Sequence, residues 1–203
     1  NEKDVENAWR SFLTQYYTQD RLYHNVQVTS PYNTDGYITI GGMGYNLRLL
    51  MEFKYNTQLS EPAGRAGILA QLIHYMYQFR LNGDELPNIL LGADEDSAFI
   101  VYAPNFYHYL EEDFNWGIAP SSAVTRDIPL YRALMEDSNT QAFVYDVSGE
   151  GDLFESNIKG ILREILEYMS GDSEGEYTIP INQQNILKLF GEFSSRAFIH
   201  TRL

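Results

Sequence analysis

Two carboxylates and a lysine stand where they would act together on a phosphate. Glu52 and Lys54 lie two residues apart in the apolar run LLMEFKY, residues 49–55. Residues i and i+2 of a β-strand project from the same face, so both side chains would share one side of a sheet while Phe53 packs on the other. Asp35 begins a second strand candidate, NTDGYITI. If the two strands are neighbours, all three groups meet at one end of the sheet.

This arrangement would suit a hard divalent cation. Carboxylates of Asp35 and Glu52, with the main-chain carbonyl of Phe53, are oxygen ligands of the kind that Mg²⁺ prefers and Mn²⁺ accepts. Such an ion polarises a phosphodiester, activates a bound water and stabilises the leaving oxygen. Lys54 beside it would stabilise charge on the phosphate or orient the attacking water.

The order of these residues resembles the signature of the PD-(D/E)XK nucleases, in which an Asp and a spacer precede Glu-x-Lys. Asp35 and Glu52-x-Lys54 match it, with Thr34 at the position of the signature's weakly kept Pro. The resemblance implies a restriction-endonuclease-like α/β fold and Mg²⁺-dependent (or Mn²⁺-dependent) hydrolysis of DNA. It assigns the catalytic role to Asp35, Glu52 and Lys54.

The next predicted helix extends the resemblance to the RecB-like branch, which includes nuclease domains of restriction-modification enzymes. Gln71 and Tyr75 stand four residues apart and share a helical face, as in the Q-x-x-x-Y motif of that branch. The resemblance implies that both position the DNA strand. The family also often places a Glu of the first helix near the metal, and Glu6 is the best match, with Glu2 behind it. The match covers about residues 1–103.

Within restriction systems, such a nuclease domain often precedes an adenine DNA methyltransferase and a target-recognition domain in one polypeptide. The sequence contains no D-P-P-Y or N-P-P-Y motif, so it would be the nuclease portion of a longer chain. Its net charge of −14 fits this arrangement, because binding to phosphates requires Lys and Arg. Other domains in cis would then grip the DNA.

Each assignment has a structural alternative. Glu52 and Lys54 would also suit an ion pair on a solvated face, and Asp35 a turn before glycine. Gln71 and Tyr75 would suit the polar flank of a core helix, and Glu6 a solvated helix position. The whole domain would then be a non-catalytic protein-binding or scaffolding module on the same fold. A hydrolase acting on RNA or on a small phosphoester would use the same residues as the nuclease.

Three other features carry residue types capable of chemistry. Arg65, at the start of the Gln71 helix, is expected at the surface or on a phosphate. His74 is expected to be a structural histidine. The acidic run at 94–96 is expected to form a hairpin turn, because it lacks the remaining ligands of a calcium site.

Composition sets the class of protein. The chain has 203 residues, of which 44% are hydrophobic, enough for a sizeable core. It has no cysteine, which excludes disulfides and thiolate metal sites and fits a reducing cytoplasm. No apolar run reaches the length of a membrane span, and no signal peptide is evident at the first residues.

Periodicity predicts the elements that carry these residues. Apolar residues recur at helical spacing over 2–19 and 63–81, and the second of these helices ends before Gly83. Three strands are predicted before the second helix. Two more are predicted after it, and the acidic turn joins these two. These strands are expected around 26–28, 37–40, 45–55, 88–93 and 97–104. The order predicts a mixed sheet flanked by helices.

The second half carries weaker signals. Helices are predicted at 129–135 and 152–170, a strand at 141–147, and one or two helices at 182–199. A boundary near 150 is expected, with a nuclease-like α/β core over 1–150. Residues 151–203 would form a helical extension that packs on the core or leads to a further domain.

Overall fold

The computed structural model describes residues 1–19, 23, 25–42, 45–149 and 151–170. Five α-helices lie in these ranges: α1 (Glu2–Gln19), α2 (Pro62–Asn82), α3 (Ala123–Arg126), α4 (Ile128–Glu136) and α5 (Asp152–Ser170). The six strands are β1 (Gln27–Thr29), β2 (Gly36–Gly42), β3 (Tyr45–Phe53), β4 (Ile89–Ala93), β5 (Ser97–Tyr102) and β6 (Val144–Asp146). Short 3₁₀ segments are η1 (Pro31–Asn33), η2 (Ala103–Glu111), η3 (Pro120–Ser122) and η4 (Ser138–Thr140). The helices expected at 182–199 lie outside the described residues.

The strands form one mixed sheet in the order β1-β2-β3-β4-β5-β6. Strand β3 runs parallel to β4, and the other neighbouring pairs are antiparallel. Helix α2 makes the crossover between β3 and β4, which a parallel pair requires. The predicted mixed sheet with flanking helices is confirmed, and β3 is a central strand as its apolar sequence indicated.

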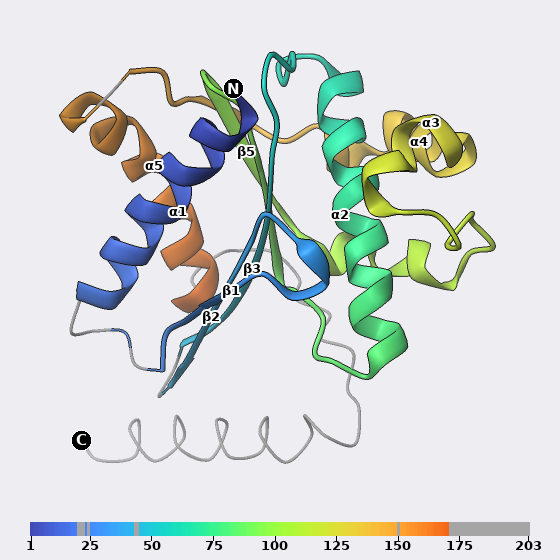
Figure 1. Cartoon of the computed structure of the whole chain (residues 1–203), viewed down its shortest axis with the longest axis horizontal. Helices are drawn as coiled ribbons and strands as arrows, with labels where there is room; N and C mark the ends of the chain where they lie inside the picture. The colour runs from blue at the N-terminus through green and yellow to red at the C-terminus, as the bar shows by residue number, and fades with distance from the viewer. Residues whose placement is uncertain (20–22, 24, 43–44, 150, 171–203) are drawn as a thin grey trace, which may run out of the picture. The chain divides into compact units, whose positions relative to one another are not determined.

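Helices cover both faces of the sheet. Figure 1 shows α1 and α5 on one side and α2, α3 and α4 on the other. Two separate clusters of buried side chains correspond to these layers. A layered α/β arrangement follows, because each sheet face buries its apolar side chains against helices.

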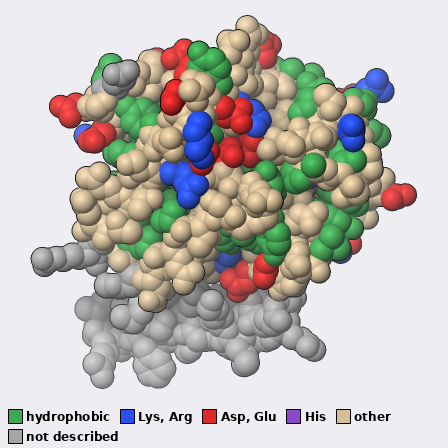
Figure 2. Space-filling view, in the orientation of Figure 1, with side chains coloured by type: hydrophobic (Ala, Val, Ile, Leu, Met, Phe, Trp, Pro, Cys, Tyr) green, Lys and Arg blue, Asp and Glu red, His purple; other side chains and the backbone are tan. Residues whose placement is uncertain are grey.

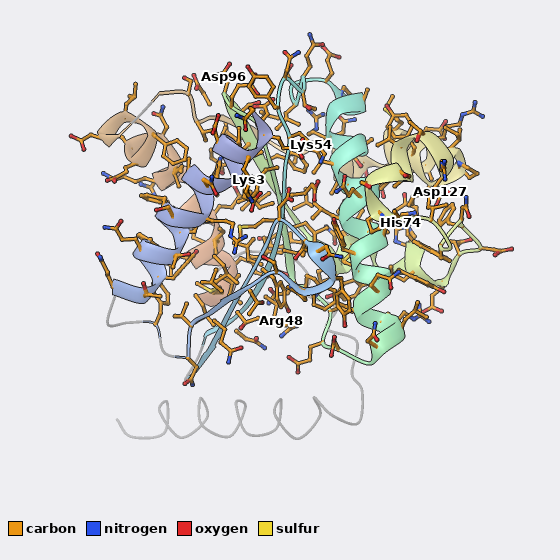
Figure 3. The ribbon with its side chains drawn as sticks, viewed as in Figure 1. Lys3, Arg48, Lys54, His74, Asp96 and Asp127 are labelled. Atoms are coloured by element: carbon orange, nitrogen blue, oxygen red, sulfur yellow. The ribbon has the colours of Figure 1, made fainter. Side chains whose placement is uncertain are left out.

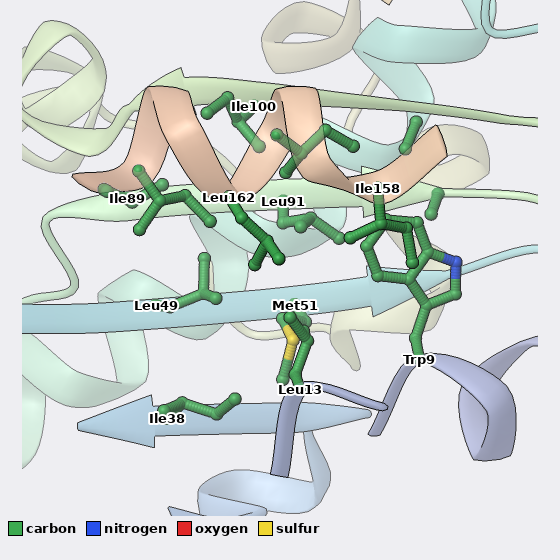
Figure 4. Close-up of a cluster of buried hydrophobic side chains, with 14 of the residues drawn as sticks. Trp9, Leu13, Ile38, Leu49, Met51, Ile89, Leu91, Ile100, Ile158 and Leu162 are labelled. Carbon is green, nitrogen blue, oxygen red and sulfur yellow. The ribbon is translucent and has the colours of Figure 1, made fainter. Parts of the chain in front are cut away.

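The cluster on the α1 side joins both ends of the described chain (Figure 4). Trp9 and Leu13 of α1 pack there with Met51 of β3 and with Ile158 and Leu162 of α5. The described residues accordingly belong to one compact unit, and α5, which begins the expected extension, shares the core of the sheet. None of the described helices combines the length and hydropathy that crossing a bilayer requires.

Helix α2 is buried on nearly all sides. The sheet covers one side, and α3, α4 and η2 contact it elsewhere. Its packing on β4 is close at Gly92, where an added Cβ would lie 2.7 Å from the side chain of Ile68 and 2.5 Å from that of Phe99. Gly83 ends the helix with a left-handed φ of 73°, a conformation that glycine adopts without strain.

The acidic run between β4 and β5 is a hairpin turn, as predicted. One carboxylate oxygen of Asp94 accepts hydrogen bonds from the main-chain N–H groups of Asp96 and Ser97, at 3.1 and 2.7 Å. It also accepts one from the Ser97 hydroxyl at 2.9 Å. The Asp94 carboxylate therefore pairs with the hydrogen-bond donors of the turn, which is a common role of Asp in turns.

Candidate metal-dependent active site

The ends of β2 and β3 bring Asp35 next to Glu52. The strands are antiparallel and Gly36 pairs with Met51, so the residues just beyond this pair lie opposite each other. The carboxylate of Asp35 accepts a hydrogen bond of 2.8 Å from the main-chain N–H of Phe53. Two residues far apart in the sequence thus meet at the end of the sheet.

Alternation along β3 sends Glu52 toward α2. Met51 and Phe53 belong to the cluster on the α1 side, whereas Leu50 belongs to the cluster on the α2 side. Glu52 shares the face of Leu50, because successive strand residues point to opposite faces. Lys54 follows the last strand residue, and its ammonium reaches back to the Glu52 carboxylate at 2.5 Å. The pairing of Glu52 with Lys54 on one face agrees with the sequence interpretation.

Glu52 is a fully buried carboxylate with an unused oxygen. Its exposed fraction is 0%, so the solvated ion pair considered above does not describe it. Its Oε1 accepts the hydrogen bond from Lys54, while its Oε2 has no hydrogen-bond partner. Burial, and after it the charge of Asp35, raise the pKa of Glu52 to about 8 against the opposing effect of Lys54. A buried oxygen of this kind is costly unless something satisfies it.

The neighbouring charged groups are perturbed by the same environment. Burial raises the pKa of Asp35, the Phe53 N–H and the Lys54 ammonium oppose the rise, and the charges of Glu6 and Glu2 add to it. Burial lowers the pKa of Lys54, but the surrounding carboxylates outweigh it and the net shift is upward. Lys54 therefore stays a cation beside two carboxyl groups.

Gln71 and Tyr75 of α2 lie beside this group. Their exposed fractions are 6% and 5%. The Gln71 amide donates to the Tyr75 hydroxyl at 3.4 Å, and that hydroxyl donates to the main-chain carbonyl of Asn33 at 3.2 Å. Burial raises the pKa of Tyr75, as do the charges of Glu52 and Asp35. Gln71 and Tyr75 thus both make hydrogen bonds to groups of the protein at the edge of the site.

Glu6 joins a network of ion pairs on α1. Its two carboxylate oxygens accept from Lys3 at 2.7 Å and from Arg10 at 3.1 Å. Lys54 also lies 3.6 Å from Glu2, and Figure 3 shows Lys54 at the same end of the sheet as Lys3. Figure 2 shows the result as adjoining basic and acidic side chains on this face. Glu6 thus borders the site with both oxygens already paired.

The residues present fit a divalent cation. The unpartnered Oε2 of Glu52 is an anionic oxygen buried without a donor, which a hard cation would satisfy. Asp35 supplies a second carboxylate, and the carbonyl of Phe53 follows Glu52 directly in the chain. Across the described ranges, no three carboxylate or imidazole side chains form a ready-made metal cluster. The ion would therefore depend on two carboxylates, a main-chain oxygen and water.

The expectation for Arg65 is wrong. Arg65 is buried, and its guanidinium donates to the main-chain carbonyls of Thr140 at 2.8 Å, Leu59 at 2.6 Å and Ser60 at 2.9 Å. These bonds tie the loop before α2 to the segment after α4, and they direct the guanidinium into the protein. The signal for burial was its position four residues before the buried Leu69, on the same helical face.

His74 is a structural histidine, as predicted. It is buried and lies 2.9 Å from the carboxylate of Asp127, on the side of α2 away from the sheet (Figure 3). Asp127 also accepts from the main-chain N–H groups of Asn115 and Leu130. Burial lowers the pKa of His74 more than the Asp127 carboxylate raises it, which favours the neutral ring.

One supporting residue escaped the sequence interpretation. Glu95, in the β4–β5 turn, accepts a hydrogen bond of 2.7 Å from the main-chain N–H of Asn56. The N–H of Lys54 donates to the carbonyl of Ala93 at 2.9 Å. The hairpin therefore holds the short segment that carries Lys54. No sequence pattern links residues 95 and 56, because the contact arises only when β4 pairs with β3.

Compared with protein-family models, curated proteins and solved structures, the chain gives no match.

Proposed function

We propose that this chain carries the active site of a metal-dependent nuclease that hydrolyses DNA phosphodiester bonds. The observation that carries the proposal is the fully buried Glu52, with one oxygen unpartnered and the other on Lys54, opposite Asp35 at the end of adjacent strands. The buried position is costly for a carboxylate without a partner. Perturbed titratable groups gathered in one place are typical of functional sites.

Asp35 and Glu52, with the Phe53 carbonyl, would hold Mg²⁺ or Mn²⁺. When bound, the ion supplies the positive charge that polarises the phosphodiester and favours ionisation of the attacking water. Glu52 would bind it as the carboxylate, so its proton leaves on metal binding. Lys54 holds Oε1 of Glu52 and keeps a positive charge at the site, where it would offset charge developing on the phosphate.

The wider setting is part of the same proposal. The net charge of −14 disfavours a tight grip on DNA by this chain alone. We place it beside DNA-binding domains in a longer polypeptide, such as the adenine methyltransferase and target-recognition domains of a restriction-modification enzyme. The cytoplasm is the compartment where such an enzyme would act.

Cleavage of DNA by the enzyme containing this chain tests the proposal. Lys54→Ala is expected to abolish Mg²⁺-dependent cleavage while the circular dichroism spectrum stays that of the folded wild type. Lys159→Ala, at an exposed position of α5, is the matched control and should cleave normally. Cleavage that persists undiminished in Lys54→Ala would refute the assignment, and a panel of DNA, RNA and small phosphoesters identifies the substrate.

The alternative is a non-catalytic binding or scaffolding module, and the acidic charge is the observation that favours it. Thermal denaturation with and without Mn²⁺ separates the two. The nuclease proposal expects Mn²⁺ to raise the melting temperature of the wild type and not that of Asp35→Asn. Absence of any Mn²⁺ effect in the wild type would favour the scaffold.

A further inference from the structure

The turn that precedes Asp35 has an unusual backbone. Tyr32 and Asn33 both adopt left-handed conformations, with φ of 58° and 63°. Such angles are uncommon outside glycine, and for a bulky side chain such as that of Tyr32 they are unfavourable. Strained conformations persist where surrounding contacts impose them, and they concentrate at functional sites. The contacts that impose this turn therefore bear on the position of Asp35.

Helix α2 and the residues after it supply those contacts. The Tyr75 hydroxyl donates to the Asn33 carbonyl at 3.2 Å. The Tyr32 ring packs on Phe79 in a T-shaped arrangement, with centroids 5.0 Å apart, and its hydroxyl bonds to the Asp84 carboxylate. Tyr75 and Phe79 lie four residues apart on one helical face, so a single face of α2 holds both left-handed residues.

The Tyr75 hydroxyl is oriented for this purpose by Gln71. Gln71 donates to the hydroxyl oxygen at 3.4 Å, which leaves the Tyr75 proton to bond to Asn33. The i, i+4 spacing of Gln71 and Tyr75 thus allows a hydrogen bond between their own side chains. Both side chains are buried.

Asp35 is consequently fixed from two sides. The left-handed turn holds its main chain next to Tyr75, and the Phe53 N–H holds its carboxylate at 2.8 Å. Loss of the Tyr75 hydroxyl would remove the hydrogen bond from α2 to the Asn33 carbonyl. The left-handed turn would then hold the main chain of Asp35 less firmly. A ligand that must lie close to its ideal position around a small ion is sensitive to such loosening.

We infer that Tyr75 is a positioning residue for Asp35, acting through the Asn33 carbonyl, with Gln71 orienting its hydroxyl. This inference rests on the proposed function, because it concerns the binding of a divalent ion by Asp35. It assigns Tyr75 a task that precedes DNA binding and needs no contact with the nucleic acid.

Mn²⁺ titration without DNA tests the inference. The wild type is titrated by calorimetry, and Tyr75→Phe is expected to bind Mn²⁺ about tenfold more weakly, the effect of losing one buried hydrogen bond. Tyr77→Phe is the matched control, since Tyr77 lies on the same helix and stacks on Trp116 with centroids 4.2 Å apart. That variant should bind Mn²⁺ as the wild type does.

A second variant separates positioning from general stability. Asn33→Gly accepts the left-handed backbone without strain and also frees the turn, so we expect an unchanged or higher melting temperature with weaker Mn²⁺ binding. This variant decides the question should Tyr75→Phe fail to fold. Mn²⁺ affinity unchanged in the folded variants, with weaker DNA binding by Tyr75→Phe, would overturn the inference in favour of direct DNA contact. Failure of the wild type to bind Mn²⁺ would instead overturn the proposed function, and the inference with it.

Discussion

Replacing Glu52 by glutamine should stabilise the metal-free protein, and increasingly so as the pH rises. The side chain keeps its size and an oxygen for Lys54 but loses the ability to ionise. Glu52 is fully buried, and its pKa rises from an ordinary 4.5 to about 8 in the folded protein. The folded state therefore holds a proton that the unfolded state releases between these values. Stability is greatest below the lower value and is lost as the pH rises through the higher one.

The magnitude follows from this shift. One pKa unit corresponds to about 1.4 kcal/mol, so the raised pKa of Glu52 lowers the free energy of unfolding by roughly 5 kcal/mol at a pH of about 9. The corresponding cost is roughly 3 kcal/mol at a pH of about 7 and about 1 kcal/mol at a pH of about 5. Glu52→Gln avoids this cost. Its advantage in the free energy of unfolding should therefore be about 1, 3 and 5 kcal/mol at these three pH values, in rising order.

Urea denaturation in the presence of a chelator measures the difference directly, because the linear extrapolation gives the free energy of unfolding at each pH. Glu112→Gln is the control, since Glu112 is exposed and its replacement should leave stability almost unchanged at every pH. A stability difference for Glu52→Gln that stays constant with pH would refute the reasoning. So would a variant that is less stable than the wild type at the highest pH.

Three further predictions concern the surrounding structure. Arg65→Met should lower the free energy of unfolding by about 3 kcal/mol or more, because it leaves several buried carbonyls without donors. Urea denaturation measures the loss, and a loss below about 0.5 kcal/mol would contradict the role assigned to Arg65. Gly92→Ala should cost about 1–3 kcal/mol, since its Cβ would lie 2.5 Å from the Phe99 ring; an unchanged melting temperature would show that the ring moves freely. Glu95→Ala should reduce the DNA cleavage rate. Glu95→Gln keeps an acceptor for the Asn56 N–H and should retain most of the rate. Equal rates in the two variants would exclude positioning of the Lys54 segment through the hydrogen bond between Asn56 and Glu95.

Local periodicity accounts for most of the element predictions. The helix over 2–19 and the strand from 45 are observed almost as expected, because apolar spacing depends only on near neighbours in the chain. The helix over 63–81 is observed from Pro62 to Asn82, since the glycine at its end is a strong stop signal. The presence of Glu52 within an apolar run likewise predicted its burial.

The sequence by itself determined which groups are available for chemistry: Asp35, Glu52 and Lys54 with their order along the chain, and a lysine two residues from a carboxylate on one strand face. Tertiary structure alone decided that β2 lies beside β3 with Gly36 opposite Met51, which places Asp35 at the Phe53 N–H. These two strands follow each other directly in the chain, since β2 ends at Gly42 and β3 begins at Tyr45. Their register depends on the turn between them and on which face is buried, and the residue types alone do not specify it.

Contacts with distant segments explain the error at Arg65 and the burial of Gln71, His74 and Tyr75. Their spacing on α2 is that of a polar flank, and a polar flank is normally solvated. Here the sheet covers one side of the helix while α3, α4 and η2 contact it elsewhere, so side chains outside its apolar stripe are enclosed as well. Whether a polar side chain is solvated or enclosed depends on segments distant in the chain. Asp127 pairs with His74, and Thr140 accepts from Arg65. The Tyr75 hydroxyl donates instead to the Asn33 carbonyl, which precedes β2.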